Sequence, residues 1–143
     1  MRINSSAFKN IIGGEFRTSI ITLKNAKLEV GTNFRMSNSA IFCAKKISIG
    51  NNVMFGGSCK IWDTDFHPLD PQERLSTPNE NFISKEIIID DNVFIGGFSI
   101  ILKGTHIGKN SIIGAGSVVA GIIPPNEIWA GNPAKFVKNL IKK

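Results

Sequence analysis

The sequence predicts an all-β protein, a parallel β-helix wound from six-residue repeats, and three observations support this fold. First, β-branched aliphatic residues recur at every sixth position, at Ile89, Ile95, Ile101, Ile107, Ile113 and Val119. Second, mostly small or β-branched residues stand four places after them, at Val93, Ser99, Thr105, Ser111, Ser117 and Ile123. Third, similar segments return at a longer period, as LEVGTN (28–33), ISIGNN (47–52), IIIDDN (87–92) and THIGKN (105–110). Self-similarity at a fixed period is typical of solenoids.

The longer period gives the size of one coil. The first two of these segments lie 19 residues apart, the last two 18, and the middle pair 40, which is two coils and a short excess. We therefore expect each coil to have three short faces, one hexad long, with the leading aliphatic residue pointing inward. Gly and Asn serve the corners, where the chain turns with unusual φ. An ordinary sandwich or barrel would alternate with period two and turn at irregular spacing.

The same register continues upstream with weaker repeats. Hexads are led by Ile49, Phe55 and Ile61, and less clearly by Val30 and Met36, with Val53, Cys59, Phe34 and Ala40 in the fourth-after slots. We therefore predict one domain over 1–143 whose residues 1–46 form degenerate coils. Two cysteines do not make a disulfide framework, and we expect Cys43 and Cys59 to be small buried side chains.

Composition restricts the class of protein. Of 143 residues 42% are hydrophobic and 20% are charged, which suits one compact domain. No apolar run is long enough to span a membrane, and the N-terminus (MRINSSAFKN) lacks the layout of a signal peptide, so a cytoplasmic protein is expected. The net charge is +6, and lysines crowd the last nine residues. Without an Arg-rich stripe interleaved with aromatics, we expect no nucleic-acid partner; a phosphorylated ligand fits better, and a solvated tail is the alternative.

The repeat fails between Phe66 and Lys85, where a loop over 67–84 carries three prolines and many polar residues. Excursions from a solenoid often carry function. His67 would occupy the next leading position after Ile61, where an aliphatic residue is expected. Asp63 and Asp65 lie just upstream, and strand geometry would put all three on one face. A carboxylate can orient an imidazole that acts as a base, so we favour catalysis over a structural, hydrogen-bonded histidine. His106 is expected to be a solvated surface residue.

Five segments carry a resemblance to a known family: HPLDPQER (67–74), IIIDDNVFIGG (87–97), IGKNSIIGAGSVV (107–119), IPPNEIWAGNPAK (123–135) and the short tail. The chain resembles the hexapeptide-repeat acyltransferases, in particular the maltose and galactoside O-acetyltransferase group. The D-x-D-F-H pattern before the loop is more similar to acetyltransferases of polysaccharide gene clusters. The resemblance covers about residues 47–143 and implies a left-handed, single-stranded β-helix.

The resemblance also implies an activity, which is transfer of acetyl from acetyl-CoA to a sugar hydroxyl by direct transfer in a homotrimer with sites between subunits. His67 falls on the catalytic histidine, and Asp65, then Asp63, is the expected partner of its imidazole. Gly97 and Ala115 fall on positions that line the pantetheine channel, and Lys135 and Lys138 on basic positions that meet the CoA phosphates. No metal is expected. A short helix over 133–143 is expected after the N-P-A motif, consistent with the helical spacing of Phe136, Val137, Leu140 and Ile141.

Some features depart from the family pattern and leave alternatives open. Ala120 and Gly121 stand where the family often has Thr-Lys, and the N-terminal helical segment that shapes the sugar pocket has no clear counterpart. An N-acetyltransferase acting on an amino sugar or sugar nucleotide would use the same fold and the same histidine. A γ-type carbonic anhydrase would need three histidines for its metal, and the chain has two. A non-catalytic scaffold would leave His67 and its acidic neighbours without a purpose.

Overall fold

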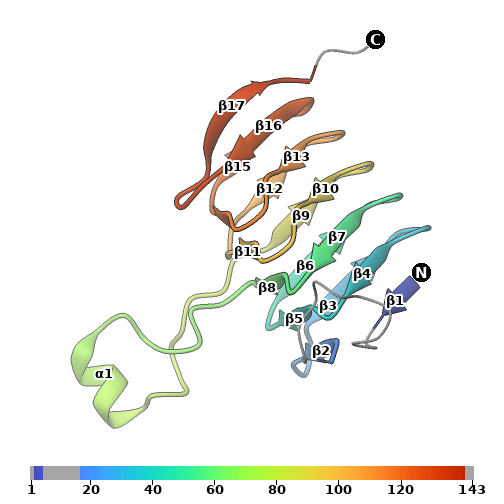
Figure 1. Cartoon of the computed structure of the whole chain (residues 1–143). Helices are drawn as coiled ribbons and strands as arrows, with labels where there is room; N and C mark the ends of the chain where they lie inside the picture. The colour runs from blue at the N-terminus through green and yellow to red at the C-terminus, as the bar shows by residue number, and fades with distance from the viewer. Residues whose placement is uncertain (1, 5–16, 141–143) are drawn as a thin grey trace.

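The computed structural model of the chain describes residues 2–4 and 17–140 and shows a β-solenoid of about six turns (Figure 1). Three sheets form its sides. Sheet A contains β1 (Arg2–Asn4), β4 (Arg35–Ser37), β7 (Met54–Gly57), β10 (Phe94–Ile95), β13 (Ile112–Ile113), β16 (Glu127–Ala130) and β17 (Lys135–Asn139). Sheet B contains β2 (Ser19–Thr22), β5 (Ala40–Cys43), β8 (Lys60–Trp62), β11 (Ile100–Ile101) and β14 (Val118–Val119). Sheet C contains β3 (Lys27–Val30), β6 (Lys46–Ile49), β9 (Ile87–Ile89), β12 (His106–Ile107) and β15 (Ile122–Ile123).

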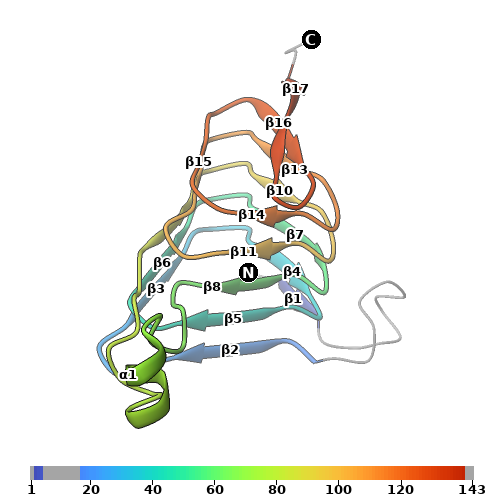
Figure 2. The ribbon, with the colours of Figure 1, turned by 90° about the vertical axis from the view of Figure 1, so that its left-hand side faces the viewer.

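The strands stack in the register that the repeat predicts. Neighbouring coils pair in parallel, and residues that lead hexads face one another, as Ile61 faces Ile101 and Ile101 faces Val119. Figure 2 shows sheet B toward the viewer, with sheets A and C forming the other two sides. The predicted parallel β-helix is therefore confirmed, whereas the left-handed winding implied by the resemblance stays a prediction.

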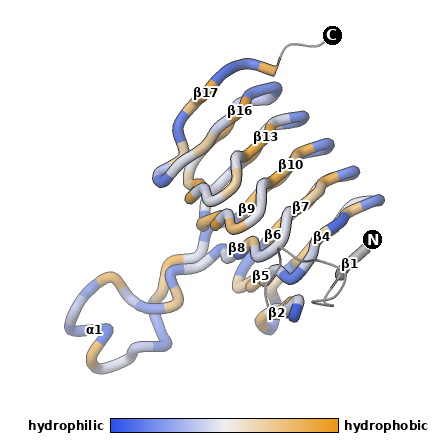
Figure 3. The backbone as a smooth tube through the Cα atoms, viewed as in Figure 1, coloured by the Kyte–Doolittle hydropathy of each residue, from blue (hydrophilic) through white to orange (hydrophobic). Residues whose placement is uncertain are grey.

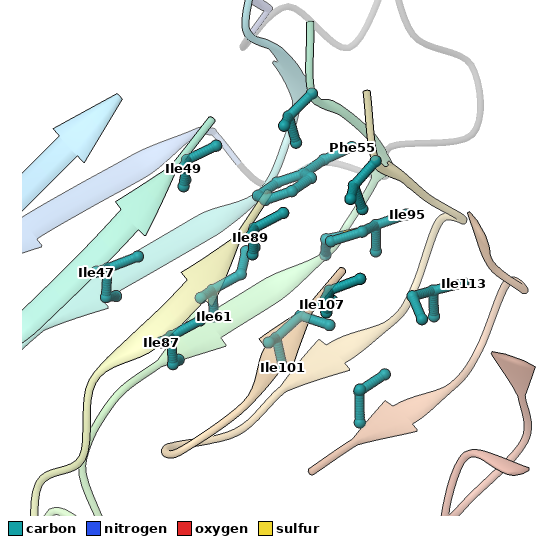
Figure 4. Close-up of a cluster of buried hydrophobic side chains, with 14 of the residues drawn as sticks. Ile47, Ile49, Phe55, Ile61, Ile87, Ile89, Ile95, Ile101, Ile107 and Ile113 are labelled. Carbon is teal, nitrogen blue, oxygen red and sulfur yellow. The ribbon is translucent and has the colours of Figure 1, made fainter. Parts of the chain in front are cut away.

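The interior is a column of the predicted leading residues. From Ile89 to Val119 every leading side chain is at most 1% exposed, and Ile49, Phe55, Ile61 and Met36 are also buried. Figure 4 shows labelled members of this column, among them Ile61, Ile95 and Ile107, converging from the three sheets. Figure 3 shows the corresponding hydrophobic segments recurring from coil to coil. Burying one such side chain stabilises a fold by roughly 1.5–3 kcal/mol, so the solenoid depends on stacking each coil on the next.

Hydroxyl groups occupy the inward positions near the corners. The Ser99 hydroxyl donates to the Gly96 carbonyl at 2.7 Å and accepts the Ser117 N–H from the next coil at 3.4 Å. Ser117 repeats this arrangement, donating to the Gly114 carbonyl and accepting the Gly131 N–H. Both side chains are fully buried. The small polar residue is thus explained by corner geometry, because it pairs backbone groups that water cannot reach.

Asparagines form a ladder along the corner between sheets C and A. The side-chain amide of each donates to the carbonyl oxygen of the next coil's asparagine, at distances of 2.8–3.1 Å. The members are Asn33, Asn52, Asn92, Asn110 and Asn126, all with φ between 56° and 64°. Asn tolerates this left-handed conformation better than other residues with side chains, which explains the predicted Asn at the corners.

We expect Asn92→Ala to lower the free energy of unfolding by about 2 kcal/mol, because alanine is strained at φ 61° and two ladder hydrogen bonds are lost. Asn92→Gly is the matched control, since glycine adopts this φ freely and loses only the ladder bonds. Urea unfolding measures both variants. Equal losses for Ala and Gly would contradict the backbone explanation.

The predicted C-terminal helix is wrong within the residues that the structure describes. Residues Lys135–Asn139 form β17, which turns back and pairs antiparallel with β16. The Phe136 ring also packs edge-on against Trp129, with centroids 6.4 Å apart. The free edge of β16 offers backbone groups that a strand can pair and a helix cannot, which outweighs the weak helical spacing. Ile141, Lys142 and Lys143 lie outside the described residues.

Both cysteines are fully buried and unpaired with each other, as predicted. Burial raises the pKa of the Cys59 thiol to about 11 and also raises that of Cys43, where the nearby Asp63 carboxylate adds to the effect. Neither thiol is therefore a ready nucleophile at neutral pH.

Candidate functional site

Within residues 17–140 the solenoid is interrupted once, at the corner between sheets B and C. The chain leaves after β8 and returns at β9, and the excursion projects away from the coils (Figure 1). Its neck is closed by an antiparallel bridge between Thr64 and Ser84, flanked by hydrogen bonds from the Asp65 N–H to Ile83 and from the Lys85 N–H to Asp63. The excursion therefore begins from a fixed base.

The HPLDPQER segment builds the structure of the excursion. Helix α1 (Pro71–Ser76) begins with proline at its first turn, and the Asp70 carboxylate caps it by accepting the Gln72 and Glu73 N–H groups. The Arg74 guanidinium donates to the carbonyls of Pro68 and Leu69, at 3.1 and 3.0 Å. The helix is thereby tied back to the turn that follows His67.

His67 lies at the start of the excursion and is exposed, so it does not fill the buried leading position to which the six-residue register assigns it. The six-residue register does not apply beyond β8, because the chain has already left the coil there. Its Nδ1 lies 2.7 Å from the Pro78 carbonyl oxygen, on the returning arm of the excursion. A carbonyl can only accept, so Nδ1 must donate, and the neutral ring then carries its lone pair on Nε2.

Asp63 has a different role from the predicted one. Its side chain is fully buried and accepts the backbone N–H groups of Ala44, Lys45 and Lys46 at 2.6–2.8 Å. It therefore holds the corner between β5 and β6 of the neighbouring coil, and it is not the partner of His67.

Asp65 is paired with a lysine that the sequence prediction missed. Its Oδ1 lies 3.0 Å from the Lys103 Nζ, and the pair is mostly buried. The other oxygen, Oδ2, is buried with no hydrogen-bond partner among the described residues. The structure thus ties Asp65 to the next coil, while the Pro78 carbonyl takes the place expected for a carboxylate beside His67. The 40-residue offset between ISIGNN and IIIDDN stacks Lys103 on Asp63. This offset is the sequence signal that could have predicted a lysine near these two aspartates.

A pocket of about 370 Å³ opens beside His67. Its walls come from the excursion and from the two coils before it, and are formed by Leu23, Phe42, Thr64, Phe66, His67, Asn79 and Phe82. The Phe66 ring packs on Phe42, with centroids 4.8 Å apart, and lies 6.1 Å from Trp62. The composition, apolar walls with a few polar groups, is typical of small-molecule sites.

Gly97 and Ala115 lie on a different corner, between sheets A and B. A Cβ added at Gly97 would come within 2.9 Å of the Gly57 carbonyl oxygen of the coil before, so close packing of coils by itself requires glycine. The Gly116 N–H donates to the Gly97 carbonyl at 2.9 Å, and Ala115 is exposed. In Figure 2 the turn from β10 to β11 lies at the right of sheet B, and the excursion lies at its left. Within one chain, therefore, the predicted cofactor-binding residues Gly97 and Ala115 lie at a different corner from the excursion that carries His67.

Lys135 and Lys138 are exposed on β17. Their cross-strand partners are Ala130 and Ile128, and the register shifts between Ile128 and Trp129, which leaves one extra residue in β17. Because Ala130 and Ile128 are two residues apart on one strand, both lysines point to the same side of the hairpin. The strand thus places both charges on one side of the terminal hairpin.

His106 is a surface residue, as predicted, and lies 3.1 Å from the Asp90 carboxylate. Within residues 2–4 and 17–140, no cluster of three His, Cys, Asp or Glu side chains has a metal-binding arrangement. The helix found in this part of the chain is too short to cross a membrane.

Comparison with known proteins identifies relatives of this fold and site. Residues 86–121 match the family model described as bacterial transferase hexapeptide (six repeats). A galactoside O-acetyltransferase of Lactococcus lactis is 45% identical over 94 residues, which is 66% of this chain and 44% of that protein. The chain spans about half the length of the curated relatives it matches.

Two solved structures extend the comparison to nearly the whole chain. A maltose O-acetyltransferase from Clostridium difficile 630 shares 36% identity and a TM-score of 0.77, covering 92% of this chain and 70% of that one. A hexapeptide-repeat acetyltransferase from Vibrio cholerae, solved in complex with acetyl coenzyme A, shares 27% identity and a TM-score of 0.76, covering 89% and 70%.

Proposed function

Because the chain belongs to the hexapeptide-repeat acetyltransferases, close to the maltose and galactoside O-acetyltransferases, we propose that it transfers an acetyl group from acetyl-CoA to a hydroxyl group of a sugar. Two relatives are named galactoside and maltose O-acetyltransferase, and a third, a hexapeptide-repeat acetyltransferase, was solved with acetyl coenzyme A bound. The observation that carries the proposal is the hydrogen bond between His67 and Pro78.

That hydrogen bond prepares His67 to act as a general base. With Nδ1 donating to the Pro78 carbonyl, Nε2 is unprotonated in the neutral ring and the side chain lines the open pocket. Nε2 takes the proton of the sugar hydroxyl while the oxygen attacks the thioester carbonyl. The tetrahedral intermediate then collapses, the C–S bond breaks, and the imidazolium returns the proton to the leaving CoA sulfur. Sugar and acetyl-CoA react directly, without an acyl-enzyme.

Asp65 acts on this base from a distance. Its ion pair with Lys103 and the hydrogen bond from its N–H to Ile83 join both arms of the neck to the next coil. The neck in turn sets the spacing between His67 and the returning arm that holds Pro78. Asp65 is therefore a positioning residue for His67 in this proposal, rather than the acceptor of its Nδ1 proton.

The cofactor would lie along the corner that contains Gly97 and Ala115. Small residues there leave room for the pantetheine arm, and Lys135 and Lys138, on one side of the terminal hairpin, would attract the CoA phosphates. The two lysines are exposed, so their contribution should weaken as ionic strength rises.

A homotrimer would bring the two halves of the site together. Gly97 lies before the amino ends of the strands of sheet B, and His67 lies beyond their carboxyl ends. The excursion of one subunit can therefore meet the Gly97 corner of the next only if sheet B faces the other subunits. The outward side chains of sheet B support this arrangement, since most are apolar: Ile21, Ala40, Phe42, Trp62, Ile100 and Val118. The outward side of sheet C is more mixed, because Lys27, Glu29, Lys46, Ser48 and His106 stand there beside Ile88 and Ile122. Light scattering should give a trimer, and a stable monomer would contradict this placement.

The function is tested by release of the CoA thiol in the presence of candidate sugars. A thiol dye should report acceptor-dependent cleavage of acetyl-CoA with galactosides, maltose or oligosaccharides. The protein's own thiols should add little signal, because Cys43 and Cys59 are buried and the pKa of each is raised. Cleavage that no sugar accelerates would contradict the proposal.

A further inference from the structure

Phe98 has a backbone conformation that does not suit its side chain. Eleven non-glycine residues in the described part of the chain have positive φ, and apart from eight asparagines and Ser58 these are Phe66 and Phe98. Phe98 has φ 62° at the corner between sheets A and B. A bulky side chain in this region strains the backbone, and such strain tends to occur at functional sites.

Packing explains Phe66 but not Phe98. The Phe66 ring lies on the rings of Phe42 and Trp62. The aromatic contacts found within residues 17–140 do not include Phe98, whose side chain is 55% exposed. Burial therefore does not compensate the strain at this corner, and asparagine or glycine would suit the fold better.

The surroundings of Phe98 match the chemistry of a sugar. Its ring lines a second pocket, of about 440 Å³, with an apolar floor that includes Ala40 and Ile100. Ser58 and Lys60 also line this pocket and bring polar groups to it, whereas the Ser39 hydroxyl is engaged with backbone groups of Ser37, Gly56 and Cys59. A pyranose has the complementary surface, with C–H groups on its faces and hydroxyl groups around its rim. An apolar floor with a few polar groups fixes such a ligand in one orientation.

We propose that Phe98 is a specificity-determining residue whose ring contacts the face of the acceptor sugar. The inference rests on the proposed acetyl transfer, and on Gly97 next to it lining the cofactor channel. The hydroxyl that attacks must reach the thioester at the end of that channel. Phe98 directly follows Gly97 in the chain, and its exposed side chain lines the pocket at this corner, within reach of an acceptor held there.

Kinetics of Phe98→Asn test this role, because asparagine is the residue most often found at the other left-handed positions of the described chain. The KM for the sugar should rise about tenfold, the order expected for one lost ring contact, while the KM for acetyl-CoA stays within about twofold. Phe98→Gly should behave in the same way. Both variants should unfold at the same temperature as the wild type or a higher one, since the backbone strain is relieved.

Phe94→Asn is the matched control. Phe94 is an exposed phenylalanine of the same coil, on the outer face of sheet A in ordinary strand geometry, and its replacement should change neither KM. If the wild type transfers acetyl and Phe98→Asn keeps the sugar KM within about twofold, the inference is wrong. A rise in the acetyl-CoA KM alone would also overturn it, because the ring would then contact the cofactor. A wild type that acetylates no sugar would instead sink the proposed function itself.

Discussion

Replacing His67 by alanine is expected to lower kcat for acetyl transfer by about 10²- to 10⁴-fold, the usual contribution of a general base. The KM for acetyl-CoA should change little, because no cofactor contact is assigned to this side chain. The fold should be retained, since the side chain is exposed and its hydrogen bond to Pro78 joins two parts of the excursion rather than two coils. Steady-state kinetics with a saturating sugar measure the effect.

His106→Ala is the control for this experiment. His106 is the other histidine of the chain, lies on the outer face of sheet C and pairs with Asp90. Its replacement should leave kcat unchanged. A His67→Ala variant with full activity would show that the proton is taken by another group, and the mechanism would be wrong.

The largest effect on stability is expected at Asp63. Asp63→Ala leaves three partly buried backbone N–H groups, at Ala44, Lys45 and Lys46, without an acceptor, and the free energy of unfolding should fall by about 3 kcal/mol. The residue lies in the coil just before the neck of the excursion, so its loss should also loosen the neck. Urea unfolding, followed by circular dichroism, measures the loss.

Asp63→Asn distinguishes the structural role of Asp63, which holds the corner between β5 and β6, from any catalytic role. The amide keeps one acceptor oxygen and the volume of the side chain, so it should lose less stability than alanine, about 1–2 kcal/mol. Since Asp63 does not contact His67, the folded variant should keep most of its kcat. If Asp63→Asn unfolds like the wild type but loses activity to the extent of His67→Ala, the carboxylate serves catalysis and the structural assignment fails.

The sequence predicted the solenoid well because its period is imposed by burial. Each leading residue from Ile89 to Val119 fills the same inward position. The need for a buried aliphatic side chain therefore recurs every six residues in the sequence. The corner asparagines and buried hydroxyls repeat for the same reason. The C-terminus was harder to predict, because the spacing of the nine residues 135–143 fits a helix and a strand equally. The free edge of β16 decides for a strand.

The position of the excursion was predicted from the sequence, but the contacts of its residues were not. His67 was identified because it interrupts a pattern, yet its orientation depends on where the chain leaves the coil, which the repeat does not encode. Carrying the strand alternation past Trp62 placed Asp63 and Asp65 beside His67. The structure instead uses them for a neighbouring corner and for Lys103, and Pro78 returns to His67 from eleven residues away. Loop contacts of this kind follow from turns and caps, such as Asp70 at α1, rather than from periodicity.

The most direct measurement is the fate of the acetyl group itself. Acetyl-CoA labelled with ¹³C in the acetyl group should be incubated with the protein and a sugar, and the products separated and analysed by mass spectrometry and NMR. The label should appear as an ester on a sugar hydroxyl, in amounts equal to the CoA released, and should be lost with His67→Ala. Label found as free acetate, or no label transferred to any sugar, would contradict acetyl transfer to a saccharide.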